Sequence, residues 1–162
     1  MQKKSRMIVF IILAVIAIAI AIMLLSTKSI TLTTNNIKVD LKYSNFNFTC
    51  EQEKNTEGIL KSNNEEIQIK INENLQDYYE SFGILKDYRM MAYNGQEKEY
   101  NSIQCFYYYD YTENSYIVIA PINEEAYLGI YIVPKEGSNK TAEETFNKKE
   151  VQKVLESLKI DA

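Results

Sequence analysis

The sequence contains no histidine and no tryptophan, and only two cysteines, five glycines and two prolines among its 162 residues. Without histidine the chain cannot form a Ser-His-Asp triad, a Cys-His pair or a histidine-ligated metal site. The two cysteines form no C-x-x-C pair, which excludes a thioredoxin-type redox centre, and the glycines form no phosphate-binding loop. The sequence therefore predicts a protein that is not an enzyme, with no catalytic residues, no metal site and no cofactor.

Carboxylate pairs are the remaining catalytic candidates, because two carboxylates alone can hydrolyse a sugar. Such pairs occur at Glu65-Glu66, Glu124-Glu125 and Glu143-Glu144. The first two lie at predicted turns, and the third lies in the first turn of a predicted helix, where acidic groups complement the helix dipole. We therefore interpret all three as solvated surface. Serine and lysine are plentiful, but no pattern marks a Ser–Lys dyad.

A stretch without any polar side chain lies near the N-terminus, from Met7 to Leu25. As a helix these 19 residues would reach roughly 28 Å, close to the ~30 Å hydrocarbon core of a bilayer. A cleaved signal peptide has a shorter apolar region followed by a small-x-small site, and residues 24–28 match that site poorly. We favour an uncleaved transmembrane anchor, with a cleaved signal peptide as the alternative.

The distribution of charge predicts which side of the membrane the chain occupies. Lys3, Lys4 and Arg6 precede the apolar stretch, and only Lys28 follows it closely. The positive-inside rule keeps residues 1–6 in the cytoplasm and places the rest outside. Residues 37–162 hold 22 acidic residues and 14 Lys and Arg, a net charge of −8. This charge argues against nucleic-acid binding.

The two cysteines, Cys50 and Cys105, are candidates for one disulfide in an exported domain. Such a bridge would close a loop of 56 residues and add about 3–4 kcal/mol of stability in the chain-entropy model. Free cysteine is also a common buried residue, so two separate thiols are the alternative.

Hydrophobic patterning divides the remaining chain into a flexible linker over 26–36 and a globular domain over 37–162. Alternating side chains predict a first strand from Ile37 and a hairpin on either side of residues 62–64. Apolar residues at helical spacing predict a helix over 74–86, and the Asn94-Gly95 pair predicts a hairpin turn. A capping box at Thr141 opens a closing helix that Asn147 divides in two. Between these helices we expect an antiparallel meander of three runs, 98–111, 116–121 and 126–133.

The last two runs of the meander are apolar on both faces. An antiparallel sheet with one wet face would show a polar residue at every second position. Both faces at the centre of the sheet are therefore expected to be covered, with one helix on each side. This predicts an α+β protein in which two helices flank a largely antiparallel sheet, a three-layer α/β/α sandwich that follows an N-terminal transmembrane helix.

The segment CFYYYDY, residues 105–111, has two interpretations. Its aromatic rings suit the interior of a covered sheet. Alternatively, Tyr109, Tyr111 and Tyr116 line a ligand-binding rim beside the turn at 112–115.

The order of elements, together with the closing stretch Val154-Leu155-Glu156-Ser157-Leu158-Lys159-Ile160, resembles the PsbP/DcrB-like family over residues 37–160. The P-x-g-W-like stretch of that family is absent, and Phe48-Thr-Cys-Glu51 stands in its place. The resemblance implies an α/β/α accessory or interaction module without catalysis, and it transfers no functional residue.

Lysine outnumbers arginine 16 to 2, and asparagine, isoleucine and tyrosine are frequent, a composition that indicates an AT-rich, bacterial genome. From these observations we expect a single-pass protein of a bacterial cell membrane that binds another envelope or membrane protein. A small-ligand or glycan-binding module that uses the tyrosine rim is the alternative.

Overall fold

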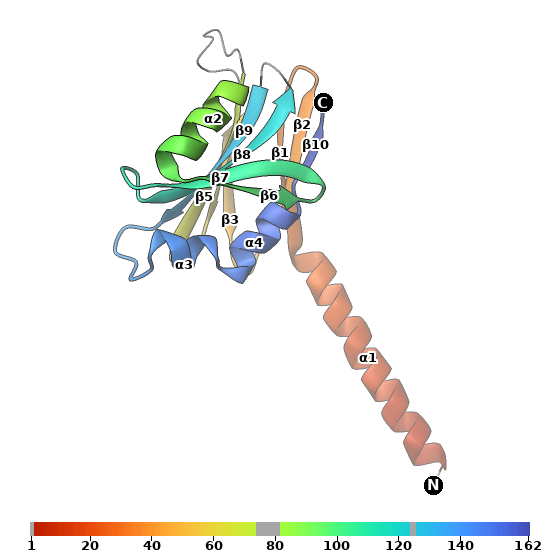
Figure 1. The fold of residues 1–162 in the computed structure, drawn as a ribbon. Helices are drawn as coiled ribbons and strands as arrows, with labels where there is room; N and C mark the ends of the chain where they lie inside the picture. The colour runs from red at the N-terminus through yellow and green to blue at the C-terminus, as the bar shows by residue number, and fades with distance from the viewer. Residues whose placement is uncertain (1, 74–81, 124–125) are drawn as a thin grey trace.

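The structure is a computed structural model that describes residues 2–73, 82–123 and 126–162 (Figure 1). It confirms an α+β protein with large antiparallel sheets and few short helices. The helices are α1 (Gln2–Ser26), α2 (Phe82–Tyr93), α3 (Ala142–Phe146) and α4 (Lys149–Glu156).

The large sheet has the strand order β3-β4-β5-β9-β8-β7-β6, and every neighbouring pair is antiparallel. The predicted meander is confirmed as β7, β8 and β9, and the predicted early hairpin is confirmed as β4 and β5. The strands are β3 (Thr49–Lys54), β4 (Glu57–Lys61), β5 (Glu65–Asn72), β6 (Gln96–Tyr100), β7 (Ile103–Asp110), β8 (Ser115–Asn123) and β9 (Ala126–Pro134).

A second, three-stranded sheet has the order β1-β2-β10, formed by Thr27–Thr34, Ile37–Ser44 and Lys159–Asp161. The prediction of a flexible linker over 26–36 was therefore wrong. Ile30 and Leu32 alternate with polar residues and are fully buried, so β1 has apolar side chains to contribute to the core. β1 also lies close to β4. The side chain of Ile30 fills the space beside Gly58, where an added Cβ would lie 2.2 Å from Cδ1 of Ile30.

Two separate hydrophobic clusters lie on the two faces of the large sheet. The larger cluster joins the sheet to β1 and β2 and to apolar side chains of α3 and α4, among them Phe146, Val151 and Leu155. The smaller cluster lies under α2, where Met90 and Tyr93 pack against Phe106, Tyr108, Ile117 and Ile119. Strand side chains alternate between the two faces of a sheet, so the same strands supply apolar side chains to both clusters. The sheet is therefore covered by α3 and α4 on one face and by α2 on the other.

The helix predicted over 74–86 lies partly outside the described residues. The residues just before Asn94-Gly95, which a hairpin turn would place in a strand, are helical and belong to α2. The Asn94-Gly95 pair ends α2 and does not join two strands. Asn94 has a φ of 50°, and the Gly95 amide donates to the Met90 carbonyl at 3.2 Å. This left-handed residue and its backward hydrogen bond are a common way to end a helix.

The run predicted as one strand over 98–111 is divided into β6 and β7. Asn101 and Ser102, with φ values of 48° and 65°, make a two-residue turn between them. Two consecutive positive φ values match the twist of a tight hairpin.

The predicted capping box is confirmed at the start of α3. Glu144 donates its amide to Oγ1 of Thr141, and its carboxylate accepts from the Thr141 amide at 3.0 Å. Asn147 ends α3, as expected, and α4 begins two residues later. Between the helices, Lys148 pairs at 2.7 Å with the buried carboxylate of Glu65, which ties α4 to β5.

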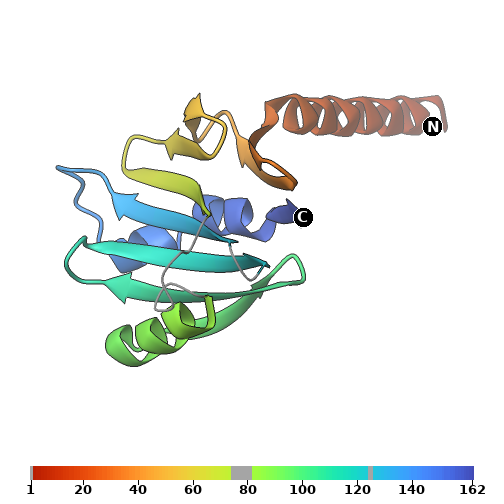
Figure 2. The same ribbon diagram turned by 90° about the horizontal axis from the view of Figure 1, so that it is seen from above.

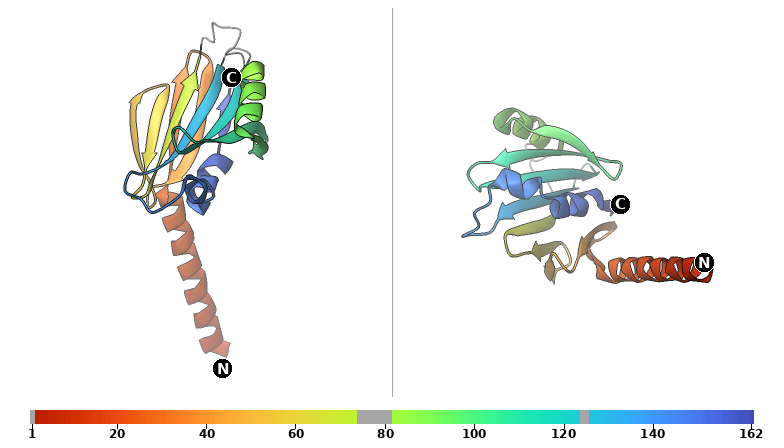
Figure 3. Two further views of the ribbon diagram at one scale, coloured as in Figure 1. Left: turned by 60° about the vertical axis from the view of Figure 1, so that its left-hand side comes forward. Right: turned by 90° about the horizontal axis from the view of Figure 1, so that it is seen from below.

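Helix α1 leaves the domain at the end where α3 and α4 lie (Figures 1 and 3). From Ile8 to Ile22 its large apolar side chains are 48% to 72% exposed, on all sides of the helix. Seen from above, α1 and α2 lie at opposite margins of the molecule (Figure 2). Within the part of the chain that the structure describes, no helix is long and apolar enough to cross a membrane.

Candidate functional site: a tyrosine-lined cleft

Tyr109 and Tyr116, two of the three tyrosines predicted to form a rim, lie together on one face of the large sheet. They are direct partners across β7 and β8, and their ring centroids are 5.5 Å apart. Phe146 of α3 stacks on Tyr116 at 4.5 Å and 12° between ring planes. Tyr107 adds a further ring 5.0 Å from Phe146. The sheet and α3 therefore hold Tyr116 firmly, while Tyr109 remains 38% exposed.

Tyr111, the third predicted member of the rim, lies on the other face of the sheet. Its ring lies 5.6 Å from Tyr93 of α2, and the side chain is 68% exposed. The physical reason is that β7 ends at Asp110, so the alternation that would place Tyr111 beside Tyr109 stops one residue earlier. The predicted trio is thus a pair and a separate residue.

A cleft of about 480 Å³ opens beside the Tyr109–Tyr116 pair, between the turn after β7 and the start of α3. Asn114, in the turn, has a φ of 46° and accepts a hydrogen bond from Oη of Tyr109 at 3.0 Å. The cleft is lined by Tyr109, Asn114, Tyr116, Lys140, Thr141, Ala142 and Glu143. Its volume lies within the ~300–1,000 Å³ range of small-molecule sites.

The polar groups of the cleft differ in what they can offer to a ligand. Burial, followed by the negative charge of Glu143, raises the pKa of Tyr116, so its hydroxyl stays protonated at neutral pH. The Thr141 amide, with help from Lys140, lowers the pKa of Glu144, whose carboxylate is occupied by the capping box. The tyrosine rings of the cleft suit the apolar face of a sugar or peptide. The neighbouring amide, hydroxyl, ammonium and carboxylate groups suit its hydrogen-bonding groups.

A second aromatic surface, which was not predicted from the sequence, lies on the α2 side of the sheet. Arg89 places its guanidinium carbon 5.6 Å from the Tyr88 ring centroid, 5.2 Å from Tyr93 and 5.6 Å from Tyr108. Since Tyr93 also contacts Tyr111, these contacts link α2 to the turn after β7. Met91 and Tyr88 are 87% and 61% exposed. We call Tyr88, Arg89, Met91, Tyr93 and Tyr111 the α2 patch.

Asp110 fixes the turn between the two aromatic surfaces. Its buried carboxylate accepts from the Thr112 amide at 2.9 Å, the Thr112 hydroxyl at 2.6 Å and the Glu113 amide at 3.4 Å. Burial alone would raise the pKa of this carboxyl, but these hydrogen bonds and the charge of Arg89 lower it. Asp110 is therefore ionised at neutral pH and acts as a structural residue of the turn.

Cys50 and Cys105, the candidates for a disulfide, are both free thiols, which matches the alternative of two separate cysteines. Cys50 is on β3 and Cys105 on β7, with four strands of the sheet between them. Strands are spaced ~4.8 Å apart, whereas a disulfide needs Cα atoms within ~7 Å. Burial raises the pKa of the Cys105 thiol to about 12, so it is a core residue without thiolate chemistry.

The described residues contain no group of three or more His, Cys, Asp or Glu side chains that could hold a metal ion. No protein-family model, no curated protein and no solved structure matches the chain. Inference about function therefore rests on the residues and their geometry.

Proposed function

We propose that the protein is a non-catalytic, membrane-anchored interaction domain of a bacterial envelope. In this proposal α1 spans the cell membrane with its N-terminus in the cytoplasm, and the three-layer α/β/α domain lies outside and binds another envelope or membrane protein. The observation that carries the proposal is the placement of exposed apolar side chains. Among the described residues they cover α1 on all sides and, on the domain, gather mainly around α2 and the turn after β7. The resemblance to the PsbP/DcrB-like family stays a prediction.

Support for the anchor comes from the uninterrupted apolar sequence of residues 7–25 and from the exposure of the α1 side chains, which a bilayer would cover. A charged residue at the centre of a membrane helix costs ~3 kcal/mol on insertion scales. We therefore expect that Ile12→Lys combined with Ile16→Lys releases the chain from membranes washed with alkaline carbonate, whereas the unchanged chain stays bound. Glu53→Lys, which changes charge on an exposed strand of the domain, is the control and should remain bound. Recovery of the unchanged chain in the wash would contradict the anchor.

Support for a protein partner comes from the composition of the α2 patch. Tyrosine, methionine and arginine are among the residue types enriched in the cores of protein interfaces. The patch contains all three and lies away from the exit of α1 (Figure 1). A protein held by the same membrane, or by the layer outside it, could therefore reach the patch.

The partner proposal can be tested with a photo-crosslinking amino acid placed at Met91 in cells. A crosslinked band of discrete mass is expected in the membrane fraction, and it should disappear when Tyr88→Ala and Tyr111→Ala are added. The same crosslinker at Glu53, on the far edge of the large sheet, should not give that band. Equal crosslinking from both positions, or none from either, would contradict a specific partner at the α2 patch.

A second candidate function is binding of a small ligand or glycan in the cleft beside Tyr109 and Tyr116. The specific observation in its favour is the exposed Tyr109 ring next to the Asn114 amide and the Glu143 carboxylate in a hollow of about 480 Å³. Soluble oligosaccharides should then raise the melting temperature of the chain. Tyr109→Ala should abolish that shift, and Tyr111→Ala, on the opposite face, should leave it unchanged. Loss of the shift in both variants, or no shift with any sugar, would argue against this site.

A further inference from the structure

We infer that the domain rests on the bilayer through a juxtamembrane surface formed by Phe46, Lys149 and Lys153, and that this surface binds anionic lipid. The inference depends on the proposed membrane anchor, because α1 would bring the domain to the lipid. It adds a second contact with the membrane, which fixes the orientation of the domain.

Phe46 is the first component of this surface. It lies in the turn between β2 and β3, and its side chain is 74% exposed. The neighbouring Phe48 is buried in the core and anchors the turn. A large apolar ring on a fixed turn is costly to leave in water but suits the boundary between headgroups and acyl chains.

The turn that carries Phe46 is tied directly to the end of α1. The Asn45 amide donates to the carbonyl of Ser26, the last residue of α1, at 2.9 Å. Thr27, the next residue, pairs with Ser44 across β1 and β2. The Asn47 and Phe48 amides both donate to the Ser44 carbonyl at 3.0 Å, which closes the turn. Phe46 is therefore held beside the point where α1 enters the domain.

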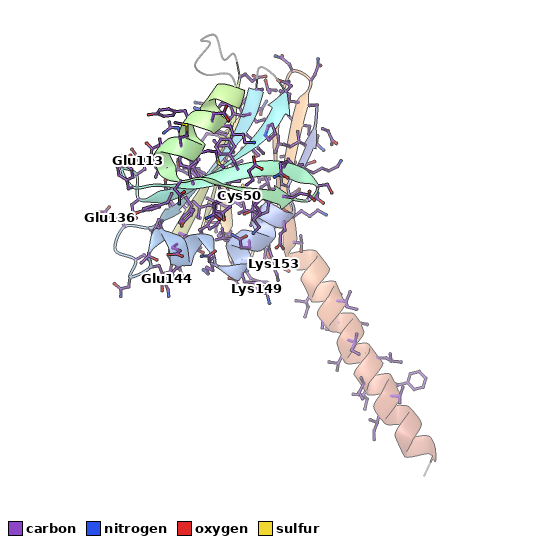
Figure 4. All side chains as sticks on the ribbon, in the orientation of Figure 1. Cys50, Glu113, Glu136, Glu144, Lys149 and Lys153 are labelled. Atoms are coloured by element: carbon purple, nitrogen blue, oxygen red, sulfur yellow. The ribbon has the colours of Figure 1, made fainter. Side chains whose placement is uncertain are left out.

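Lysines of α4 provide the charge of this surface. A hollow of about 340 Å³ at the end of α1 is lined by Ser26 and Thr27 on one side and by Glu150, Lys153 and Val154 of α4 on the other. Lys149 and Lys153 are one helical turn apart and exposed, while Val151, Val154 and Leu155 point into the core. Figure 4 shows both lysines on the side of the domain from which α1 leaves.

Neither Lys149 nor Lys153 forms an ion pair with another described residue, so both ammonium groups are available to lipid phosphates. Lys28, just after α1, adds a third exposed cation. The domain as a whole is acidic, and it would be repelled by an anionic leaflet in a random orientation. Each basic side chain near such a surface favours binding by about fivefold. The local lysines and Phe46 would therefore select one orientation, with the α2 patch turned away from the bilayer.

The absence of tryptophan allows a direct test, because a single introduced tryptophan is then the only such fluorophore. The full chain is reconstituted into phosphatidylcholine vesicles with and without phosphatidylglycerol, and brominated lipids are used as quenchers. Phe46→Trp should show blue-shifted emission and quenching by lipids brominated near the headgroup. Met91→Trp, at a position that is also exposed but lies on α2, should emit as in water and resist quenching. Phe10→Trp reports separately on insertion of α1.

Lys149→Gln combined with Lys153→Gln should lower the docked-to-free ratio in phosphatidylglycerol vesicles by about fivefold per lysine, and added salt should have a similar effect. If Phe10→Trp is quenched by deeply brominated lipid but Phe46→Trp behaves as Met91→Trp does, the juxtamembrane surface is overturned and the anchor stands. If Phe10→Trp is not quenched, the anchor fails and this inference fails with it.

Discussion

The two faces of β7 present the same residue type in opposite roles. Tyr109 points toward α3 and remains partly open to a cleft, whereas Tyr108, one residue earlier, is buried under α2 beside Arg89. Phe106 and Tyr108 belong to one hydrophobic cluster, while Tyr107 and Tyr116 pack against the other. Neighbouring tyrosines of one strand therefore do not form a common site, because their side chains point to opposite faces of the sheet. The tyrosines that cooperate are those paired across strands or packed beneath the same helix.

The largest expected effect concerns the buried α2 side of this comparison. Phe106→Ala should lower the free energy of unfolding by about 3–5 kcal/mol, because it removes a fully buried ring and leaves a cavity. Tyr109→Ala, on the cleft side, should cost only about 1 kcal/mol through the lost ring contact with Tyr116. Denaturant unfolding of the full chain in detergent, followed by circular dichroism, would measure both. Equal losses would mean that the two faces do not differ in packing as described.

A smaller effect is expected at the turn that separates the two faces. Asp110→Ala should cost about 1–3 kcal/mol, because it leaves the Thr112 and Glu113 amides without their acceptor. Since the folded state lowers the pKa of Asp110, its contribution is present above pH ~4 and is lost as the pH falls below that value. The unfolding midpoint of the unchanged chain should therefore fall more steeply with acid than that of Asp110→Ala. Glu113→Ala, which keeps the backbone donor, is the matched control and should match the unchanged chain.

A still smaller loss is expected for Arg89→Met, which keeps much of the apolar stem but removes the cation over three tyrosine rings. The stability should fall by about 0.5–2 kcal/mol. The pKa of Asp110 should rise as well, because the positive charge of Arg89 helps to lower it. Titration of the Asp110 carboxyl by NMR in both chains would detect that rise, and Lys135→Met, a surface lysine, should not cause it. An unchanged Asp110 pKa in Arg89→Met would show that the two groups do not interact.

The smallest expected effect is a change in the alkaline titration of Tyr108, on the α2 face of the sheet. Burial raises the pKa of Tyr108 to about 12, so its neutral form stabilises the fold, and this contribution is lost as the pH rises above ~10. Absorbance of tyrosinate should include a group that ionises near pH 12, and Tyr108→Phe should reduce its amplitude. An unchanged titration curve in that variant would place Tyr108 in a wetter environment than the packing of α2 implies.

Much of the large sheet could be predicted from the sequence, because apolar residues on both faces of β8 and β9 reflect cover on both sides. The capping box at Thr141 and the break at Asn147 could also be predicted, because both depend on hydrogen bonds between residues close in the sequence. The strand β1 was missed although Ile30 and Leu32 alternate with polar residues, since its threonine-rich composition also suits a linker. That alternation was the available signal.

The limits of α2 and the position of Tyr111 could not be predicted from local sequence. The Asn94-Gly95 pair suits both a hairpin turn and the end of a helix, and only the packing of Met90 and Tyr93 on the sheet distinguishes the two. Tyr111 continues the tyrosine run, but the hydrogen bonds to Asp110 begin a turn before it. The contact with the Tyr93 ring places Tyr111 on the α2 face of the sheet. Tyr93 and Tyr111 are distant in the sequence, so no local pattern predicts this contact.

The most direct test of the proposed membrane anchor is to determine on which side of the membrane each end of the chain lies. In a chain with Cys50→Ser and Cys105→Ser, one new cysteine is placed at Glu53 in the domain or at Gln2 before α1. A membrane-impermeant maleimide is applied to spheroplasts before and after lysis. We predict that Glu53→Cys reacts before lysis and that Gln2→Cys reacts only afterwards. Reaction of Glu53→Cys only after lysis, or a mature chain that lacks residue 2, would contradict an anchored exterior domain.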